Sequence, residues 1–181
     1  NEETNFNVIS IYISNVSFWL DTLDLWNSFS NRISTIYLPD RKRPMLPTIL
    51  SDALCSLTEG DIRFALTLDL YVEKNTGKIL LHKFKNTMIK VHKNLRYDTD
   101  EMNNYSEYNT LFQHITLMNQ KQKYVNNIKS SHEVVAYLMI IMNYMCALKL
   151  KNNKTGIYRS AKLNSTYQPP NNIDNNIQQF L

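Results

Sequence analysis

The stretch YLPDRKRPMLPTILSDALCSLTEGDIR, residues 37–63, carries more information about the fold than any other part of the chain. Its three prolines fix the backbone angle φ and remove hydrogen-bond donors, so they predict a fixed loop around the basic residues 41–43. A short strand is expected just before the prolines, at 34–38, and a short helix just after them, at 48–54. We refer to residues 37–63 as the signature segment.

On the N-terminal side of the signature segment, the pattern predicts a strand followed by a helix. Residues 8–16 read VISIYISNV, which is rich in β-branched and aromatic residues and therefore typical of a strand. Residues 21–33 place apolar side chains at helical spacing, and Asp21 is the expected N-cap of that helix.

On the C-terminal side, strand patterns give way to helical ones. Residues 62–72 and 79–91 are strand-like and flank the sequence KNTG at 74–77, which is typical of a β-hairpin turn. Residues 105–124 and 132–150 predict two helices, the second of them apolar on more than one face. Strands in the first half and helices in the second indicate an α+β fold.

The composition permits one folded domain and excludes several other classes. The chain has 181 residues, of which 43% are hydrophobic and 20% charged, with only 3 Gly and 5 Pro. Collagen, a Pro/Gly linker and a highly charged disordered chain are therefore excluded. The net charge of +4 is compatible with a nucleic-acid partner. Because the first residue is Asn1 rather than Met, we expect a segment or a processed product.

Neither a structural zinc site nor a membrane span is expected. Cys55 and Cys146 are far apart in the sequence, which contains no CxxC and no HExxH motif. Two buried free thiols fit a reducing compartment. The most apolar stretch, 134–150, contains Asn143 and Lys149 and is expected to be too short and too polar to cross a bilayer.

The residue types alone define no catalytic constellation. Asp98, Asp100 and Glu101 form the densest acidic cluster, and converging carboxylates can hold Mg²⁺. Their place in a polar turn before a helix favours capping instead. The sequence has no G-x-S-x-G motif and no glycine-rich phosphate loop. We therefore assign no catalytic residue and expect no metal site within this chain.

The order of motifs in the signature segment resembles that of the RNB family, exoribonucleases of the RNase II, RNase R and exosome catalytic-subunit type. The shared elements are a strand ending in YLP, a loop with MLP, the motif LS-x-x-LCSL and an arginine shortly after it. ISIYISNVSFW at 9–19 resembles the family's HIADVS strand, and YLMIIMNYMCA at 137–147 resembles its long helix. The resemblance covers residues 8–160.

This resemblance implies an RNB-like α+β fold, in which a mixed sheet is wrapped by helices. The chain is expected to contain this domain without its two ends. Residues 1–167 then form the central part of the RNB domain, and 168–181 a polar tail or linker into a missing C-terminal part. The implied activity is 3′→5′ hydrolytic degradation of single-stranded RNA, with release of 5′-nucleotides. Mg²⁺ is the implied cofactor, held by aspartates that precede the HIADVS strand in the family and so lie outside this segment.

Partners and location follow from the same resemblance. It implies single-stranded RNA as the partner and no membrane, with a larger RNA-degradation complex as an open alternative. It also implies an intracellular location, in the cytoplasm or the nucleus. The full-length protein is then expected to be an Mg²⁺-dependent exoribonuclease, whereas the isolated segment is expected to be inactive.

Several polar positions depart from the family pattern. Tyr12 and Asn15 stand where the family has His and Asp, Ala136 and Tyr137 replace its paired glutamates, and Ala161 replaces a His. A second hypothesis therefore stays open, in which the chain is a catalytically inactive RNB-like domain that binds RNA or a protein partner. A divergent gene from an AT-rich genome is a third explanation of the departures.

The candidate RNA-binding residues are those that match the family motif. They are Tyr37, Ser51, Asp52, Ser56, Arg63, Tyr158 and Arg159. Arginine binds phosphate oxygens in a bidentate fork and tyrosine stacks on bases, whereas the three short polar residues belong to the loop of the signature segment. A structural role stays open for each, in particular a pairing of Arg63 with Asp61.

Overall fold

The computed structural model describes residues 5–29 and 34–158, so Arg159, Ala161 and the tail predicted at 168–181 lie outside the described residues. The elements in chain order are β1 (Phe6–Ser14), α1 (Val16–Thr22), α2 (Trp26–Phe29), β2 (Ile36–Tyr37), β3 (Lys42–Arg43), the π-helix η1 (Ile49–Leu54), β4 (Ile62–Glu73), β5 (Ile79–Lys90), α3 (Asp100–Asn103), α4 (Ser106–Lys121) and α5 (Ser131–Asn152). The predicted α+β class is confirmed.

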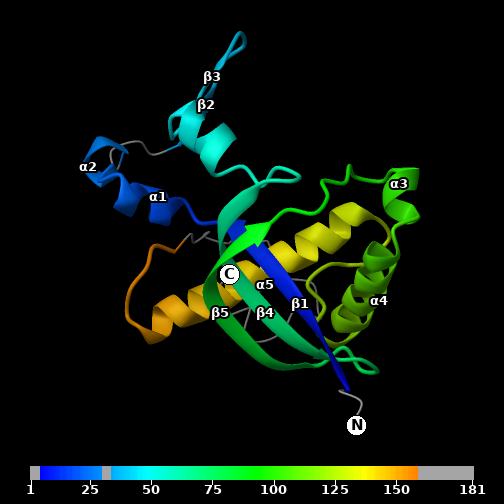
Figure 1. Ribbon diagram of the computed structural model, residues 1–181. Helices are drawn as coiled ribbons and strands as arrows, with labels where there is room; N and C mark the ends of the chain where they lie inside the picture. The colour runs from blue at the N-terminus through cyan, green and yellow to red at the C-terminus, as the bar shows by residue number, and fades with distance from the viewer. Residues whose placement is uncertain (1–4, 30–33, 159–181) are drawn as a thin grey trace, which may run out of the picture. The chain divides into compact units, whose positions relative to one another are not determined.

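The long strands form a three-stranded sheet in the order β1–β4–β5 (Figure 1). Near its two ends, β1 is joined to β4 by backbone hydrogen bonds between Asn5 and Lys74 (3.1 Å) and between Asn15 and Phe64 (2.9 Å). Residue numbers rise along one strand and fall along the other, so the two strands are antiparallel. A short turn joins β4 to β5, which confirms the hairpin predicted from KNTG.

The chain divides into two compact units. The helical unit consists of Asn1–Ile9, Leu70–His82 and Leu95–Leu181, and the signature unit consists of Ser10–Asp69 and Lys83–Asn94. Each of the strands β1, β4 and β5 contributes residues to both units. The signature segment belongs wholly to the signature unit.

In the helical unit, the turn between β4 and β5 packs closely against α4 at Gly77. A Cβ atom added to Gly77 would lie 2.7 Å from backbone atoms of both Leu117 and Met118. The φ angle of Gly77 is +69°, in the left-handed region that glycine adopts without strain. Glycine is therefore the residue that fits this contact without displacing the helix.

Helices α4 and α5 pack against each other in the helical unit, and both were predicted from their apolar spacing. Ile115 and Met118 of α4 and Ile141 of α5 are at most 1% exposed. Tyr137 is also fully buried, and its hydroxyl donates to the carbonyl of Gln122 (3.2 Å). Burial raises the pKa of Tyr137, so the hydroxyl keeps its proton and serves as this donor.

The first turn of α5 is fastened by two carboxylates. The Glu133 carboxylate accepts from the N–H (2.7 Å) and the hydroxyl (2.6 Å) of Ser130. The Asp98 carboxylate accepts from the N–H (3.1 Å) and the hydroxyl (2.6 Å) of Ser131. These bonds from Ser131 hold the pKa of Asp98 below its ordinary value. Asp98 is thus engaged in capping, as a polar turn before a helix predicts.

Among the helices of residues 5–29 and 34–158, α5 alone is long and apolar enough to cross a membrane by length and composition. It has 22 residues, and 22% of its most apolar window is buried. The expectation that this segment is too short and too polar is wrong, because the helix begins before residue 134 and ends after residue 150. The core helix of a soluble protein can have the same length and apolar composition, so these two properties do not by themselves identify a span.

In the signature unit, α1 begins earlier than the sequence predicts. Its N-cap is Asn15, whose side-chain oxygen accepts from the N–H of Phe18 (3.2 Å). The predicted cap, Asp21, instead accepts a hydrogen bond from the indole N–H of Trp26 (2.5 Å). Because α1 ends at Thr22 and α2 follows as a separate helix, the single helix predicted over 21–33 is wrong within the described residues.

A buried carboxylate ties the three strands of the signature unit together. Asp69 on β4 is 4% exposed; its carboxylate accepts from the Ser10 hydroxyl of β1 (2.6 Å) and pairs with the Lys85 ammonium of β5 (2.6 Å). Burial alone raises the pKa of Asp69, but the hydrogen bonds from Lys85 and Ser10 outweigh it and hold the pKa below its ordinary value. These partners compensate a charge that would otherwise be costly to bury.

Candidate nucleic-acid interface

The signature segment folds into two parts that differ in burial. The first is the hairpin β2–β3, residues 36–43, which we call the basic hairpin. The second is the loop 55–61 between η1 and β4, which we call the fastened loop. The helix predicted at 48–54 is present between them as η1. Figure 1 shows the basic hairpin projecting beyond α1 and α2 of the same unit.

The basic hairpin is a minimal antiparallel ladder. Ile36 pairs with Arg43, and Tyr37 pairs with Lys42. The N–H of Leu38 donates to the carbonyl of Arg41 (2.8 Å) and closes the turn between the strands. Pro39 occupies the second position of that turn, where its fixed φ is favourable. The short strand predicted before the prolines is confirmed as β2, whereas the fixed loop predicted around 41–43 contains a second strand, β3.

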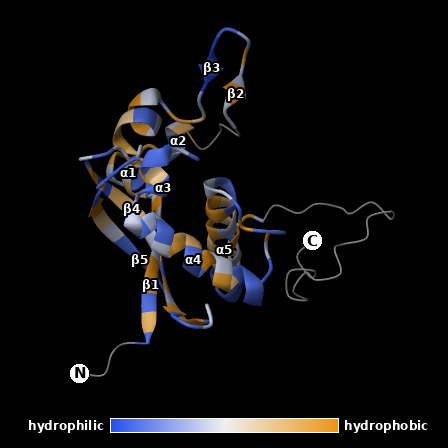
Figure 2. Cartoon of the chain, turned by 90° about the vertical axis from the view of Figure 1, so that its right-hand side faces the viewer, coloured by the Kyte–Doolittle hydropathy of each residue, from blue (hydrophilic) through white to orange (hydrophobic). Residues whose placement is uncertain are grey.

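Every residue of the basic hairpin is exposed. Tyr37 is 80% exposed and Ile36 is 54% exposed, although apolar side chains of this size are commonly buried. Directly opposite residues share a face of the ladder, so Tyr37 lies beside Lys42 and Ile36 beside Arg43. Figure 2 shows the result as a hydrophobic strand β2 next to a hydrophilic strand β3. Each face therefore combines one apolar and one cationic side chain.

The basic hairpin is connected to η1 through Lys42. The Lys42 ammonium lies 3.6 Å from the Asp52 carboxylate, which also accepts from the Ser51 hydroxyl (2.8 Å). Three of the predicted RNA-binding residues, Tyr37, Ser51 and Asp52, are thereby brought together around Lys42. A carboxylate repels phosphate and the exposed ion pair with Lys42 is weak, so binding of RNA at Asp52 stays a prediction.

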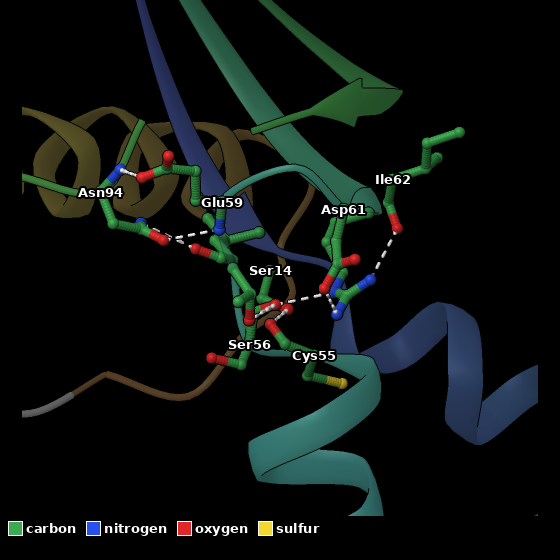
Figure 3. Close-up of polar contacts among 10 residues, drawn as sticks. Ser14, Cys55, Ser56, Glu59, Asp61, Ile62 and Asn94 are labelled. Atoms are coloured by element: carbon green, nitrogen blue, oxygen red, sulfur yellow. Dashed lines mark hydrogen bonds and ion pairs between the residues drawn. The ribbon is translucent and has the colours of Figure 1, made fainter. Parts of the chain in front are cut away.

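In the fastened loop, three consecutive carbonyl oxygens each accept a hydrogen bond from a side chain (Figure 3). The Ser14 hydroxyl donates to the carbonyl of Cys55, and the Arg63 Nε donates to that of Ser56 (2.7 Å). The Asn94 amide donates to the carbonyl of Leu57 (3.0 Å). The donors come from the end of β1, the start of β4 and the segment after β5. Because these side chains satisfy the backbone of the loop, they fix its path.

Asn94 also holds the loop through Glu59. Its side-chain oxygen accepts from the N–H of Glu59 (2.6 Å), and the Glu59 carboxylate accepts from the N–H of Asn94 (3.0 Å). Next to this pair, the N–H of Gly60 donates to the carbonyl of Val91 (2.8 Å). The loop is thus joined to the segment that follows β5 by both side-chain and backbone bonds.

Arg63 makes three hydrogen bonds within and beside the loop. Besides the carbonyl of Ser56, its guanidinium reaches the carbonyl of Ile62 (3.0 Å) and the carboxylate of Asp61 (2.7 Å). Its side chain is 18% exposed. The predicted pairing of Arg63 with Asp61 is confirmed. Two of the five N–H groups of the guanidinium remain, so binding of a phosphate by Arg63 stays a prediction.

The other predicted RNA-binding residues are not gathered in this cluster. The backbone carbonyl of Ser56 belongs to the fastened loop. Tyr158 belongs to the helical unit, is 47% exposed and donates from its hydroxyl to the carbonyl of Thr155 (2.8 Å). Arg159 lies outside the described residues.

Ser14 and Asn94 hold the fastened loop although their sequence context does not predict this role. Ser14 lies 41 positions from its acceptor Cys55, and Asn94 lies 37 positions from its acceptor Leu57. Local spacing carries no signal for a pairing at such separations. The buried position predicted for Cys55 is confirmed, and burial raises the pKa of its thiol. Cys146, also predicted to be buried, is partly exposed.

Two departures from the RNB pattern have structural roles here. Asn15 caps α1, and its amide also donates to the side chain of Asn86 (3.2 Å). Tyr137 fills the core of the helical unit, as described above. Both positions therefore serve the fold through groups that carry no negative charge.

The described carboxylates do not form a metal site. Within residues 5–29 and 34–158, no group of three or more His, Cys, Asp or Glu side chains is arranged to hold a metal ion. Asp98, from the densest acidic cluster, accepts from Ser131 and lies 3.5 Å from the Nε2 atom of His132. These residues do not fit the Mg²⁺ site that the resemblance implies.

Comparison with known proteins defines the class of domain to which this fold belongs. Residues 2–110 match the profile of the RNB domain. The chain therefore belongs to the RNB family, as its signature segment indicates. Ribonuclease R of Ureaplasma parvum is 35% identical to it over 111 residues, or 60% of the chain. Exoribonuclease 2 of Vibrio parahaemolyticus is 48% identical over 66 residues, or 35% of the chain.

Solved structures agree with this assignment at the level of the fold. RNase R of Mycoplasma genitalium, in complex with double-stranded RNA, aligns with a TM-score of 0.65 over 82% of this chain and 33% of that chain, at 22% identity. Its complex with ribose-methylated single-stranded RNA aligns with a TM-score of 0.62. The chain spans 15% of the Ureaplasma relative and 10% of the Vibrio relative.

Proposed function

We propose that this chain is part of a 3′→5′ hydrolytic exoribonuclease that acts on single-stranded RNA and releases 5′-nucleotides. The observation that carries the proposal is the match of residues 2–110 to the RNB domain. The relatives in that region are named Ribonuclease R and Exoribonuclease 2. Because the chain spans a small share of these relatives, the activity is proposed for the complete protein that contains it.

Within that protein, the proposed task of this chain is to hold and contact RNA. The exposed ring of Tyr37 is available to stack on a base, and the neighbouring Lys42 to meet a phosphate. The fastened loop keeps η1 and β4 in a fixed relation within their unit, which gives this surface a rigid base. Contacts by Arg63, Tyr158 and Arg159 are part of the same proposal.

For the cofactor, we propose that Mg²⁺ is held by carboxylates outside the described residues. The absence of a suitable cluster in residues 5–29 and 34–158 supports this division of labour. An aspartate-rich motif encoded immediately upstream of Asn1 is the expected source of the ligands. Translation of the flanking DNA tests this directly: a stop codon close upstream, or a reading frame without clustered aspartates, removes the basis for the enzyme.

A second function is favoured by one specific observation. Asn15 and Tyr137, which stand where the family has acidic residues, serve as a helix cap and a core side chain. This supports an RNB-like domain that has kept its framework and lost its chemistry. Such a domain binds single-stranded RNA, or a protein partner, without degrading it.

Degradation by the complete protein separates the two functions. We expect a 5′-labelled single-stranded RNA to shorten from its 3′ end in the presence of Mg²⁺, with 5′-nucleotides among the products and no reaction in a chelator. Chromatography of the products and gel analysis of the labelled strand provide the readout. RNA that is bound but remains intact in Mg²⁺ supports the inactive domain and contradicts the enzyme.

We also propose an intracellular location, in the cytoplasm or the nucleus, for the complete protein. The names of its relatives, which are ribonucleases, support this location. Association with a larger RNA-degradation complex stays a prediction. Co-purification of the tagged complete protein with other RNA-degrading factors tests it.

A further inference from the structure

The cationic side chains at the tip of the basic hairpin are not part of the buried core of their unit. Arg41, Lys42 and Arg43 are consecutive, and all three are exposed. We propose that they form a contact for the phosphate backbone of a single-stranded RNA, separate from the base-stacking position offered by Tyr37. The inference rests on the proposed function in one respect, namely that the complete protein binds RNA.

The geometry of the hairpin supports a contact along a strand rather than a single ion. The register pairs Tyr37 with Lys42 and Ile36 with Arg43, so one cation lies on each face of the ladder. Arg41 lies in the turn just before β3. The three charges therefore point in different directions around one narrow projection. A flexible polyanion can follow such a projection, whereas a compact anion reaches one charge at a time.

The carboxylates near the tip bind these cations only weakly. Arg41 Nε lies 3.7 Å from Asp40, and the Lys42 ammonium lies 3.6 Å from Asp52, with both partners of each pair more than half exposed. Exposed ion pairs of this length are weak, so a phosphate can take the place of the carboxylate. The side chain of Arg43 has no ion-pair or hydrogen-bond partner among residues 5–29 and 34–158, and a guanidinium can bind phosphate in a bidentate fork.

The apolar side chains beside the charges favour RNA over a purely ionic partner. Ile36, Leu38 and Met45 are 54%, 38% and 39% exposed. Together with the cations, these side chains form a mixed apolar and basic surface, which suits a partner with both apolar and anionic groups. Single-stranded RNA offers both phosphates for the cations and unstacked bases for the apolar side chains. An acidic protein segment is the competing partner, and the test below separates the two.

The test is the salt dependence of RNA binding by the complete protein. The triple variant R41Q/K42Q/R43Q is compared with the matched variant K74Q/K78Q/K123Q, which removes the same charge from exposed lysines of the helical unit. Binding of a fluorescent single-stranded RNA is followed by anisotropy in chelator, so that degradation does not interfere. A third variant, R41K/R43K, keeps the charge and reports whether charge or arginine geometry is required.

We expect that only the triple hairpin variant changes the salt dependence of RNA binding. Each phosphate contact in a single strand contributes about 0.7 to the slope of log K against log salt, so the triple hairpin variant should lose about 2 from that slope. Its affinity should fall about 10-fold or more, whereas the matched lysine variant and R41K/R43K should stay close to wild type. An unchanged slope in the triple variant, or equal losses in both glutamine variants, overturns the inference.

The same data distinguish this inference from the proposed function. If the triple hairpin variant lowers the salt slope of RNA binding but the wild-type protein does not degrade RNA, the hairpin contact is supported and the exoribonuclease is contradicted. If the wild-type protein degrades RNA but the triple hairpin variant leaves the salt slope unchanged, the exoribonuclease is supported and the hairpin contact is contradicted. The wild-type complete protein could instead bind an acidic peptide through the hairpin and bind no single-stranded RNA. That result overturns both the hairpin contact with RNA and the proposed exoribonuclease. Circular dichroism of each variant identifies any loss of folding.

Discussion

The basic hairpin and the fastened loop belong to one signature segment, yet they use their polar side chains in opposite ways. In the fastened loop, three successive carbonyl oxygens are taken by side chains of Ser14, Arg63 and Asn94. In the basic hairpin, the charged side chains are exposed and make at most weak ion pairs. A motif that reads as one functional unit in the sequence therefore contains a part that holds the fold and a part that is free to bind.

This difference changes the meaning of the arginines. The motif ends at Arg63 and favours it as a phosphate ligand, but three of its N–H groups already serve the loop. Arg43 belongs to the basic run 41–43 inside the motif, and it is exposed. Burial and existing hydrogen bonds, rather than membership of the motif, thus distinguish a residue that holds the structure from one that is available to a ligand.

The largest effect is expected from Arg63→Met, which keeps the apolar stem and removes the donors. It leaves the carbonyl of Ser56 without its guanidinium partner, and we expect the free energy of opening of the fastened loop to fall by about 2 to 3 kcal/mol. Native-state hydrogen exchange on peptides from 55–63 measures this quantity in the complete protein. Arg96→Met, at an exposed arginine, is the control and should change it by less than about 0.5 kcal/mol. Equal effects of the two variants would contradict the fastening role.

A smaller loss is expected from Asn94→Ala. The change removes the bonds to the carbonyl of Leu57 and to the N–H of Glu59, and both groups keep some access to water. We expect the loop to lose about 1 to 1.5 kcal/mol in the same exchange measurement. Asn126→Ala, at an exposed asparagine, should leave the loop unchanged. Faster exchange in both variants would point to a general effect on the fold.

Ser14→Ala should have a comparable or slightly smaller effect at the other end of the loop. The Ser14 hydroxyl donates to the carbonyl of Cys55, and its loss is expected to destabilise the loop by about 1 kcal/mol. Because Cys55 is buried, the opening that results should expose its thiol. The rate of thiol labelling is the measurement, and Ser28→Ala in α2 is the control. A labelling rate that does not change would show that the hydroxyl contributes nothing to the loop.

The smallest effect on stability is expected from the triple variant of the basic hairpin. R41Q/K42Q/R43Q removes only exposed side chains, so hydrogen exchange in the fastened loop should change by less than about 0.5 kcal/mol. A larger change would mean that the hairpin supports the loop and that the two parts are not independent. Together with the RNA-binding data, this variant shows whether the exposed part of the motif is needed for contact alone.

The sequence predicts the long elements well, because β4 and β5 flank a recognisable hairpin turn, α4 has apolar residues at helical spacing, and α5 is a long apolar segment. It fails at the boundaries of the short elements, which the apolar pattern does not mark. Asn15 takes the cap expected at Asp21 because it lies where β1 ends and the chain turns into α1, a boundary that the apolar spacing does not mark. The short strand β3 is likewise missed, since two charged residues between prolines give no strand signal.

The candidate site was predicted in the same uneven way. The motif identifies the signature segment and the pairing of Arg63 with Asp61, which are neighbours in sequence. It does not reveal the partners Ser14 and Asn94, which approach the loop only after the strands have assembled. Nor does it tell that Tyr37 lies beside Lys42, because this depends on the register of a hairpin that was expected to be a loop.

The most direct test of the account compares Arg63→Met with R41Q/K42Q/R43Q in two measurements on the complete protein, loop opening and the salt slope of RNA binding. We predict that Arg63→Met lowers the free energy of loop opening by about 2 to 3 kcal/mol and reduces the slope by no more than one phosphate contact, about 0.7. The hairpin variant should leave loop opening unchanged and reduce the slope by about 2. The reverse pattern, with the slope lost at Arg63 and stability lost at the hairpin, would contradict the division of the signature segment into a holding part and a binding part.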